Sequence, residues 1–451
     1  MLNHSLLIPQ WNYQLWLEKP PLMLWITACF YKLFAVNEFW ARAGSALSGV
    51  AIIGILHRWL IARKDIVTAW ISTLLLLATF GYLHVCRVGE MDVLLSLGCC
   101  IALWGLNLVQ QSEAKGWYVF WAGFAVAVMT KGAASIVLLL TLLLIFLLEQ
   151  WWKKPSRFGR SWWLGILLFF LVVLPWHLYM FHLFGRLFID QYLGFHVLAR
   201  ATTQIEGHAS HWWYYLNVLF VSAAPFVLVY PFAIGYSLRR PELRIWGLFS
   251  LVVLVFFTLV QTRLPHYIAL AYPSLTLISA AYIGEKLQPW LRRERTKLSW
   301  MTATVPALAV CILSALLTAP GRHRLREAKS ANGTSLQQDQ QSITLLRRSA
   351  ANPQLPPGPL LLWHAQPIIS VATDVFYSRR HVQQVQLNTP PPQSAIDKYI
   401  FNPMPIEDAV SSQPGLILLD SALVQQIPTG LTYKRIEASQ TEELGSIARS
   451  K

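Results

Sequence analysis

Long runs of apolar residues, separated by short polar stretches, repeat along the first 320 residues. A helix needs ~20 apolar residues to cross a bilayer. Runs of about this length predict membrane spans at 38–57, 66–86, 92–111, 116–130, 132–149, 162–182, 212–236, 244–262, 266–284 and 299–319. We therefore expect residues 1–319 to form an all-α polytopic membrane domain of about 10–11 helices.

The pattern changes after Pro320, where polar stretches rich in Gln, Ser and Pro begin. The apolar runs 359–364 and 415–420 are typical of buried strands, and 432–438 of a closing strand. Residues 372–381 and 421–427 indicate helical turns after the first two strands. We expect residues 320–451 to form a small soluble α/β domain, and we find no motif in it that indicates an activity.

Composition and charge agree with a membrane protein. Of 451 residues, 55% are hydrophobic and 13% are charged, and 20 are Trp, which is unusual for a soluble domain. The net charge of +15 is concentrated on alternate loops, which hold 16 Lys and Arg, whereas the intervening loops hold 6. Positively charged loops face the cytoplasm. This distribution explains the basic excess without a nucleic-acid partner, for which we find no motif.

This sidedness places residues 1–21 and the C-terminal domain outside the cytoplasm. Only one crossing fits between the outer N-terminus and the basic loop 57–65, so residues 20–37 are better explained by a helix lying in the outer interface. Pro20 and Pro21 suit its first turn, where a missing N–H costs little. The five cysteines have no CxxC spacing, so we expect packing residues and neither a disulfide framework nor a zinc site.

Polar residues at membrane depth are costly and indicate a site. The outer loops contain such residues in five stretches, including the pair Glu18 and Lys19 directly before two prolines. The cations are Lys19, Arg87, Lys131, Arg200 and Arg263; the carboxylates are Glu18, Glu90, Asp92 and Glu206; the histidines are His196, His208, His211 and His266. Cations can bind a lipid phosphate, and a carboxylate can accept a proton from an attacking group.

Each of these residues also has a simpler interpretation. Arg87 and Asp92 could form an interfacial ion pair that caps a helix, and Lys131 could extend to the surface. Trp212 and Trp213 are typical of an aromatic belt at the membrane interface. No single residue is therefore specific for a function.

Taken in order, the stretches resemble the polyprenyl-phosphate-sugar glycosyltransferases of the protein O-mannosyltransferase and lipid A aminoarabinose transferase superfamily (family 39). The resemblance covers residues 5–285 and rests on "LIPQWNYQLWLEKPPLMLW", "RVGEMDVLL", "TKG", "PWHLYM", "GHASHWWYY" and "TRLPHYIALAYPSL". It implies the large transmembrane glycosyltransferase fold of the GT-C type. It also implies an integral protein of the bacterial inner membrane, with its site on the extracytoplasmic side.

The resemblance implies that a sugar moves from a polyprenyl phosphate, such as undecaprenyl phosphate, to a lipid, glycan or protein acceptor. The partners would be the lipid-linked sugar, membrane lipids and the acceptor. Asp92 and Glu18 are then the candidate catalytic residues, and Lys19, Arg87, Lys131 and Arg263 the candidate phosphate ligands. The implied substrate cavity includes His196, His208, His266 and Tyr267. A divalent metal could take part, although no ligand spacing requires one.

Three positions depart from the family pattern. His211 stands where Pro is common, Phe195 where Glu is usual, and Arg263 where Lys is common. Arg keeps the phosphate-binding charge, whereas loss of the Glu weakens the case for a metal or sugar contact there.

The family's first helix and the acidic pair after it have no counterpart before Met1. We therefore expect either a start codon further upstream or a chain unable to catalyse. An in-frame stop directly upstream of Met1 would exclude the first explanation. Two other functions stay open from sequence: a transporter or flippase of a lipid-linked sugar, for which we find no internal repeat, and an inactive homologue that binds the lipid.

Overall fold

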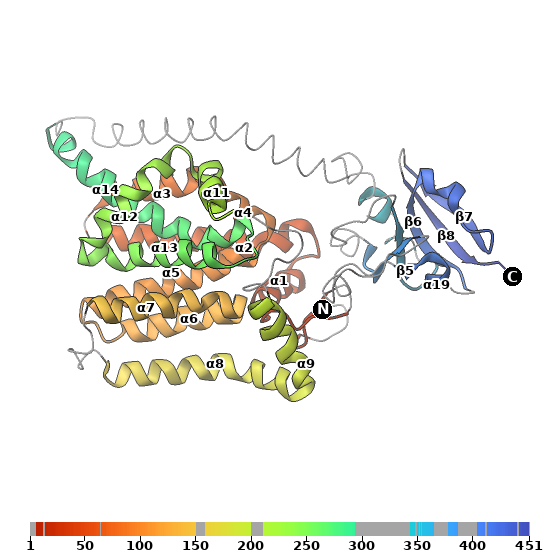
Figure 1. The fold of residues 1–451 in the computed structure, drawn as a ribbon, viewed down its shortest axis with the longest axis horizontal. Helices are drawn as coiled ribbons and strands as arrows, with labels where there is room; N and C mark the ends of the chain where they lie inside the picture. The colour runs from red at the N-terminus through yellow and green to blue at the C-terminus, as the bar shows by residue number, and fades with distance from the viewer. Residues whose placement is uncertain are drawn as a thin grey trace. The chain divides into compact units, whose positions relative to one another are not determined.

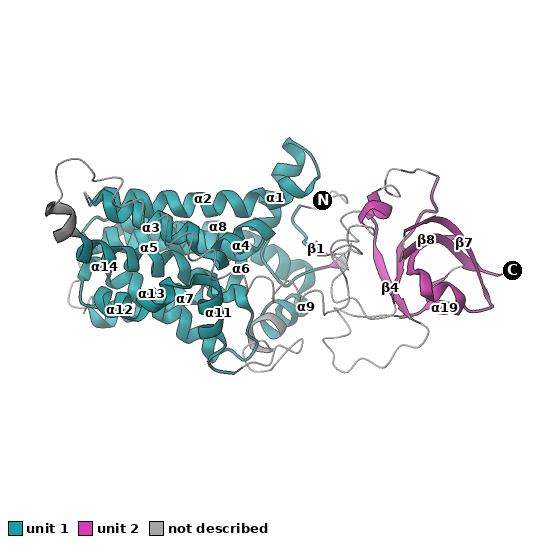
Figure 2. Cartoon of the chain, turned by 90° about the horizontal axis from the view of Figure 1, so that it is seen from above, with its two compact units in different colours: residues 1–9, 16–322 teal, residues 10–15, 323–451 magenta. Residues whose placement is uncertain are grey.

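The computed structural model describes residues 6–11, 14–63, 65–149, 158–199, 211–293, 343–347, 350, 352, 354–364, 378–386, 404–410, 413–439 and 442–450. The chain divides into two compact units. The first contains residues 1–9 and 16–322, and the second contains residues 10–15 and 323–451 (Figure 2).

Helices make up the first unit (Figure 1). The α-helices are α1 (Leu22–Leu33), α2 (Glu38–Ile61), α3 (Ile66–Ala78), α4 (Phe80–Val88), α5 (Met91–Gln110), α6 (Gly116–Lys131), α7 (Ile136–Leu148), α8 (Arg160–Phe184), α9 (Arg186–Ile189), α11 (Tyr214–Ala223), α12 (Tyr230–Leu238), α13 (Pro241–Leu259) and α14 (Tyr272–Arg293). Three 3-10 helices, η1 (Gly132–Ser135), η5 (Phe226–Val229) and η6 (Pro265–Ala271), and the π-helix η4 (Asp190–Ala199) join them.

Six helical stretches of the described chain are long and apolar enough to cross a membrane, and up to eight if each of two bent pairs counts as one span. The bent pairs are α3 with α4, at 65°, and α11 with η5 and α12, at 119°. The protein is therefore an integral multi-pass membrane protein. The expected span at 299–319 lies outside the described residues.

The two bends correct the expectation of continuous helices at 66–86 and 212–236. At the first bend Thr79 has an extended backbone, with ψ 101°, and its hydroxyl donates a hydrogen bond to the Leu75 carbonyl at 2.8 Å. At the second bend Pro225 follows α11, and proline has no N–H to continue the helical hydrogen bonds. Local backbone chemistry thus interrupts runs that hydropathy alone reads as single helices.

The apolar stretch 116–148 folds back on itself at Gly132. Gly132 has a positive φ of 43°, which ends α6. The Gln110 amide, at the end of α5, donates to the Pro241 carbonyl at 2.9 Å, and Glu149, after α7, pairs with Arg244 near the start of α13. Because both ends of the stretch lie near the start of α13, α7 runs antiparallel to α6. The predicted division of this run into two segments thus agrees with the structure.

Helices α5 and α6 pack closely through glycines. A Cβ at Gly105 would lie 2.4 Å from the Phe120 nitrogen, and one at Gly123 would lie 2.4 Å from the Ala102 nitrogen. Small residues allow membrane helices to approach this closely. The packing fixes the start of α5 against the end of α6.

Helix α1 has 12 residues, which is about 18 Å of helix and too short to cross a bilayer. Pro21 is its N-cap, as expected from the paired prolines. Trp25 donates a hydrogen bond to the Leu6 carbonyl at 2.7 Å and holds the N-terminal segment against the helix.

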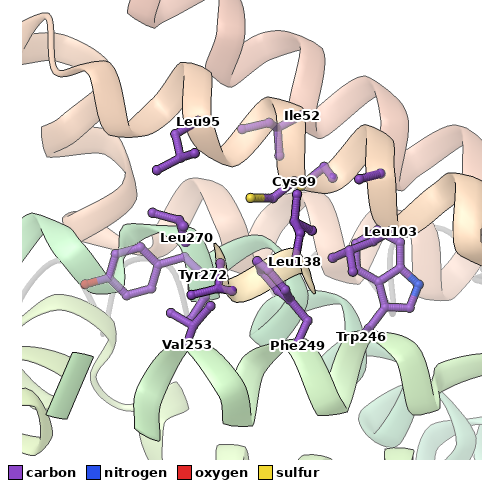
Figure 3. Close-up of a cluster of buried hydrophobic side chains, with 14 of the residues drawn as sticks. Ile52, Leu95, Cys99, Leu103, Leu138, Trp246, Phe249, Val253, Leu270 and Tyr272 are labelled. Carbon is purple, nitrogen blue, oxygen red and sulfur yellow. The ribbon is translucent and has the colours of Figure 1, made fainter. Parts of the chain in front are cut away.

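Aliphatic and aromatic side chains from α2, α5, α7, α13 and η6 form the core of the first unit. Figure 3 shows Ile52, Leu95, Cys99, Leu138 and Trp246 pointing into this cluster. Cys99 and Cys100 are buried and free, in keeping with packing roles, and Cys29 is free and exposed.

The second unit contains a six-stranded sheet of order β5-β4-β3-β6-β8-β7. Its strands are β3 (Leu360–Trp363), β4 (Val382–Gln386), β5 (Met404–Pro405), β6 (Gly415–Asp420), β7 (Leu431–Ala438) and β8 (Glu442–Arg449). Strands β3, β4, β5 and β6 are parallel, while β8 pairs antiparallel with both β6 and β7. The short helices α19 (Ile406–Ala409) and η7 (Ser421–Gln426) follow β5 and β6, and a separate two-stranded ladder joins β1 (Gln10–Trp11) to β2 (Gln14–Leu15).

Three of these strands and one helical turn match the sequence expectation: β3, β6, β7 and η7. Strands β4, β5 and β8 were not expected. Most of the predicted helical turn at 372–381 lies outside the described residues. Buried residues cover both faces of the sheet, with Trp363 and Ile417 on one face and Leu362 and Leu418 on the other.

Candidate functional site

A cavity of about 830 Å³ lies in the first unit, where α4 meets α5, α6 meets α7, and α13 meets η6. Its charged and ionisable lining residues come from five separate stretches of the chain. They are Glu18, Lys19, Glu90, Asp92, Lys131, Tyr192, His266 and Tyr267. The end of the helix bundle opposite the start of α13 therefore carries a polar cavity.

The turn between α4 and α5 places two carboxylates in the cavity. Gly89 ends α4 with a φ of 81°, a conformation that favours glycine, and Glu90 is the N-cap residue of α5. The Ser45 hydroxyl donates to the Glu90 carbonyl at 3.0 Å and holds the turn against α2. Asp92 follows in the first turn of α5, where the helix dipole favours negative charge, and its side chain is only 3% exposed.

Lys131, the last residue of α6, neutralises Asp92. Its Nζ donates to both carboxylate oxygens, each at 2.8 Å, and its side chain is 13% exposed. The Tyr267 ring lies 4.8 Å from the same Nζ and adds a cation–π contact. This pair corrects the simpler interpretations in which Lys131 extends to the surface and Asp92 pairs with Arg87.

Residues of η6 and of the segment before α1 complete the polar lining. His266 Nε2 lies 4.0 Å from an Asp92 oxygen, on the helical turn that Pro265 begins. Glu18 and Lys19 immediately precede the two prolines, and the Lys19 Nζ lies 5.5 Å from the centre of the Trp16 ring. The cavity thus combines three carboxylates with two ammonium groups.

The remaining wall of the cavity is apolar. It is built by Phe124, Ile136, Leu139, Phe256, Phe257, Val260 and Leu264. A lining that combines charged groups with aliphatic and aromatic ones suits a ligand that has a charged head and a hydrocarbon chain.

Tyr192 lines the cavity beside the turn at Gly132. The Tyr192 hydroxyl lies so close to Gly132 that a Cβ there would be 2.2 Å from it. His177 Nδ1 lies 2.8 Å from the Val173 carbonyl, which only accepts hydrogen bonds, so Nδ1 carries the proton and Nε2 accepts from Tyr192 at 3.1 Å. Burial raises the pKa of the Tyr192 phenol, so that it stays a donor.

The structure brings six of the predicted site residues into one cavity: Glu18, Lys19, Asp92, Lys131, His266 and Tyr267. Arg87 is exposed at the end of α4, and the Arg263 guanidinium donates to the Thr258 carbonyl, with Nη2 at 2.8 Å. Neither residue lines the cavity. His208 and the side chain of His196 lie outside the described residues, and His211 stacks on Trp213.

One group in the cavity could hold a cation. Donor atoms of Glu90, Asp92 and His266 all lie within 4.8 Å of one another. A divalent ion there would compete with Lys131, which occupies both Asp92 oxygens. Tyr192 was not among the predicted residues, and Glu90 was named only among the outer-loop carboxylates, without a role. The carboxylate pair in "GEMD" was a usable signal for Glu90, whereas nothing in the sequence around Tyr192 marks it.

Comparisons with known proteins show what the chain is similar to. Residues 18–179 match the family described as dolichyl-phosphate-mannose-protein mannosyltransferase. An uncharacterised protein of Aquifex aeolicus is 27% identical over 316 residues, covering 68% of this chain and 61% of that protein. The undecaprenyl phosphate-alpha-4-amino-4-deoxy-L-arabinose arabinosyl transferase 1 of Pseudomonas fluorescens (strain Pf0-1) is 27% identical over 309 residues, which is 64% of this chain and 52% of that protein. The chain thus spans between half and two thirds of the length of these relatives.

A solved structure shares the fold. The crystal structure of ArnT from Cupriavidus metallidurans bound to undecaprenyl phosphate has a TM-score of 0.73 at 18% identity, and the match covers 99% of this chain and 91% of that one. The predicted membrane glycosyltransferase fold is thereby confirmed. The chain is thus similar in sequence to proteins named as undecaprenyl-phosphate sugar transferases and similar in fold to ArnT.

Proposed function

We propose that this protein transfers a sugar from a polyprenyl-phosphate donor to a lipid, glycan or protein acceptor at the extracytoplasmic face of a bacterial inner membrane. The observation that carries the proposal is the cavity itself, where Lys19 and Lys131 face the same space as an apolar wall. A lipid phosphate offers an anion for the ammonium groups and a hydrocarbon chain for the wall. Relatives named as undecaprenyl-phosphate aminoarabinosyl transferases support the choice of donor.

In the proposed reaction the acceptor hydroxyl or amine attacks the anomeric carbon of the sugar. The bond between that carbon and the phosphate oxygen breaks, and polyprenyl phosphate leaves with both electrons. Lys19 and Lys131 stabilise the charge that grows on the phosphate. Two of the three Lys131 N–H groups hold Asp92, and the third remains for a phosphate oxygen.

Asp92 is the proposed base for the acceptor proton, and Glu18 the group that orients the sugar. Each Asp92 oxygen accepts one hydrogen bond from Lys131 and has a second lone pair, so the carboxylate can still take a proton. Helix α5 and the Lys131 contact hold this group in place, as a positioned base requires.

The test is transfer from a panel of radiolabelled polyprenyl-phosphate hexoses and pentoses in proteoliposomes. Lys19→Ala should lower transfer by about 100-fold or more, because it removes a preorganised phosphate ligand. Lys115→Ala is the matched control: Lys115 precedes α6 at the opposite end of that helix from Lys131, its side chain is 69% exposed, and it pairs with the nearby Glu113.

Wild-type transfer by the Lys19→Ala protein, correctly inserted, would contradict the phosphate role of Lys19. Donor that is bound without release of polyprenyl phosphate would instead indicate a binding protein. Donor that crosses the bilayer unchanged would indicate a transporter.

A further inference from the structure

Three side chains that can ligate a metal meet at one edge of the sheet in the second unit. His364 Nδ1 lies 3.0 Å from an Asp420 oxygen and 3.9 Å from a Glu442 oxygen. The donor atoms of all three residues lie within 4.8 Å of one another. None of them belongs to the cavity of the first unit.

Strand register explains why they meet. Trp363 pairs with Leu419 across β3 and β6, so the next residues along, His364 and Asp420, are also neighbours. Asp420 in turn pairs with Glu442 across β6 and β8. The three residues therefore form one row across three adjacent strands, at the carboxyl ends of the parallel strands β3 and β6. Ligands of parallel α/β sheets bind beyond this edge.

The row interrupts an otherwise aliphatic face of the sheet. Side chains alternate between faces along a strand, so His364 shares a face with Leu362, Asp420 with Leu418, and Glu442 with Leu444. These leucines and their neighbours on that face are buried, in a cluster that includes Leu360 and Leu416. In this row each of the three strands therefore carries a potential metal ligand, whereas its neighbouring residues on the same face are aliphatic.

The row is also largely removed from water. The side chains of His364, Asp420 and Glu442 are 10%, 17% and 2% exposed. Two carboxylates held this close repel each other, and a positive charge between them relieves that repulsion. A divalent cation bound to both carboxylates and a neutral imidazole makes the group neutral.

The spacing suits such an ion. Ligand atoms at about 2.0–2.2 Å from a tetrahedral metal lie roughly 3.4 Å from one another. The separations of His364 Nδ1 from the Asp420 and Glu442 oxygens, 3.0 and 3.9 Å, lie on either side of this value. One imidazole nitrogen with two carboxylate oxygens is a ligand set for Zn²⁺ or Mn²⁺, and three protein ligands leave a position for water.

We propose that His364, Asp420 and Glu442 bind one divalent transition-metal ion. The ion replaces the proton on His364 Nδ1, which leaves to solvent, and it links β3, β6 and β8 at their common edge. This site is independent of the sugar transfer proposed for the first unit.

The experiment is metal binding by the full-length protein, purified without a histidine tag, treated with a chelator, and titrated with Zn²⁺ and with Co²⁺ as a spectroscopic probe. We expect one equivalent to bind, with Co²⁺ absorption that indicates a four-coordinate nitrogen and oxygen site. Glu442→Gln and Asp420→Asn keep the side-chain shape and should weaken binding at least about tenfold, by analogy with the loss seen when the partners of a ligand are removed. His364→Gln should do the same.

His266→Gln is the matched control, because it disrupts the other candidate cation group, in the cavity of the first unit. It should leave the bound equivalent in place. The absence of a saturable site in the wild-type protein would overturn the proposal, and so would loss of the equivalent in His266→Gln alone. A variant that unfolds is replaced by the other two, and an equivalent retained by the folded variants of His364, Asp420 and Glu442 would also overturn the proposal.

Discussion

Lys131 and Asp92 form a buried ion pair in which each group depends on the other. Removing one partner of such a pair leaves an uncompensated charge and typically costs about 3–5 kcal/mol. Lys131→Met should therefore destabilise the protein strongly, whereas Lys131→Met combined with Asp92→Asn should recover part of the loss. Thermal unfolding in detergent, followed for both variants and for the exposed control Lys115→Met, measures this difference.

Equal unfolding temperatures for the single and double variants would contradict this prediction, because removal of the Asp92 charge would then have recovered nothing. Such a result would mean that other neighbours stabilise Asp92. One of these neighbours is His266, whose Nε2 lies 4.0 Å from an Asp92 oxygen.

The residues that sequence identified best were charged groups at membrane depth. Asp92, Lys131 and Glu18 could be selected because charge is costly there and needs a reason. Tyr192 could not be selected, because an aromatic residue near a membrane surface is ordinary. Its position against Gly132 depends on the backbone of a distant helix turn. Arg87 and Arg263 were selected by the same charge argument and lie away from the lining of the cavity, which residue type alone could not reveal.

Helices α5 and α6 carry Asp92 and Lys131, so their separation sets the geometry of the pair. Gly105→Ala would place a Cβ 2.4 Å from the Phe120 nitrogen and 2.7 Å from the Gly116 carbonyl oxygen. Both are backbone atoms, which cannot move aside as the end of a flexible side chain can. We expect a loss of about 1–3 kcal/mol from this overpacking. Sugar transfer should fall as well, because the ends of the two helices move apart.

Gly54→Ala in α2 is the control for this prediction. A Cβ at Gly54 meets nothing within 4 Å, and alanine is favoured over glycine inside a helix by roughly 0.5–1 kcal/mol. Its unfolding temperature should stay the same or rise. An unchanged Gly105→Ala protein would mean that the two helices are less tightly packed than the structure has them.

At the level of elements, hydropathy located the membrane helices but not their bends. Thr79 and Pro225 interrupt apolar runs without changing the mean hydropathy of those runs. In the second unit the strands that were predicted are continuous apolar runs such as β6. Strand β4, "VQQVQ", is polar between its two valines, and β8, "EELGSIAR", contains a glycine and charged ends. Their pairing with buried strands, rather than their composition, makes them strands.

For the whole molecule, the distribution of Lys and Arg predicts which side the cavity faces. We expect Val36→Cys, in the exposed segment between α1 and α2, to react with a membrane-impermeant maleimide in intact cells. Ala114→Cys, in the exposed loop between α5 and α6, should react only after permeabilisation. Both are made with Cys29 and Cys311 replaced by Ser, because Cys29 is exposed and Cys311 lies outside the described residues. The reverse labelling pattern would place the cavity on the cytoplasmic side.

The charges around the cavity also affect how fast the product of the proposed reaction, polyprenyl phosphate, is released. A polyprenyl phosphodiester carries one negative charge, whereas the monoester that remains after transfer carries roughly 1.5 to 2. If Lys19 and Lys131, which line the cavity, bind the donor phosphate as proposed, they bind the more highly charged spent lipid more strongly. In an enzyme built this way the departure of polyprenyl phosphate becomes the slow step, and accumulated lipid phosphate inhibits the next cycle.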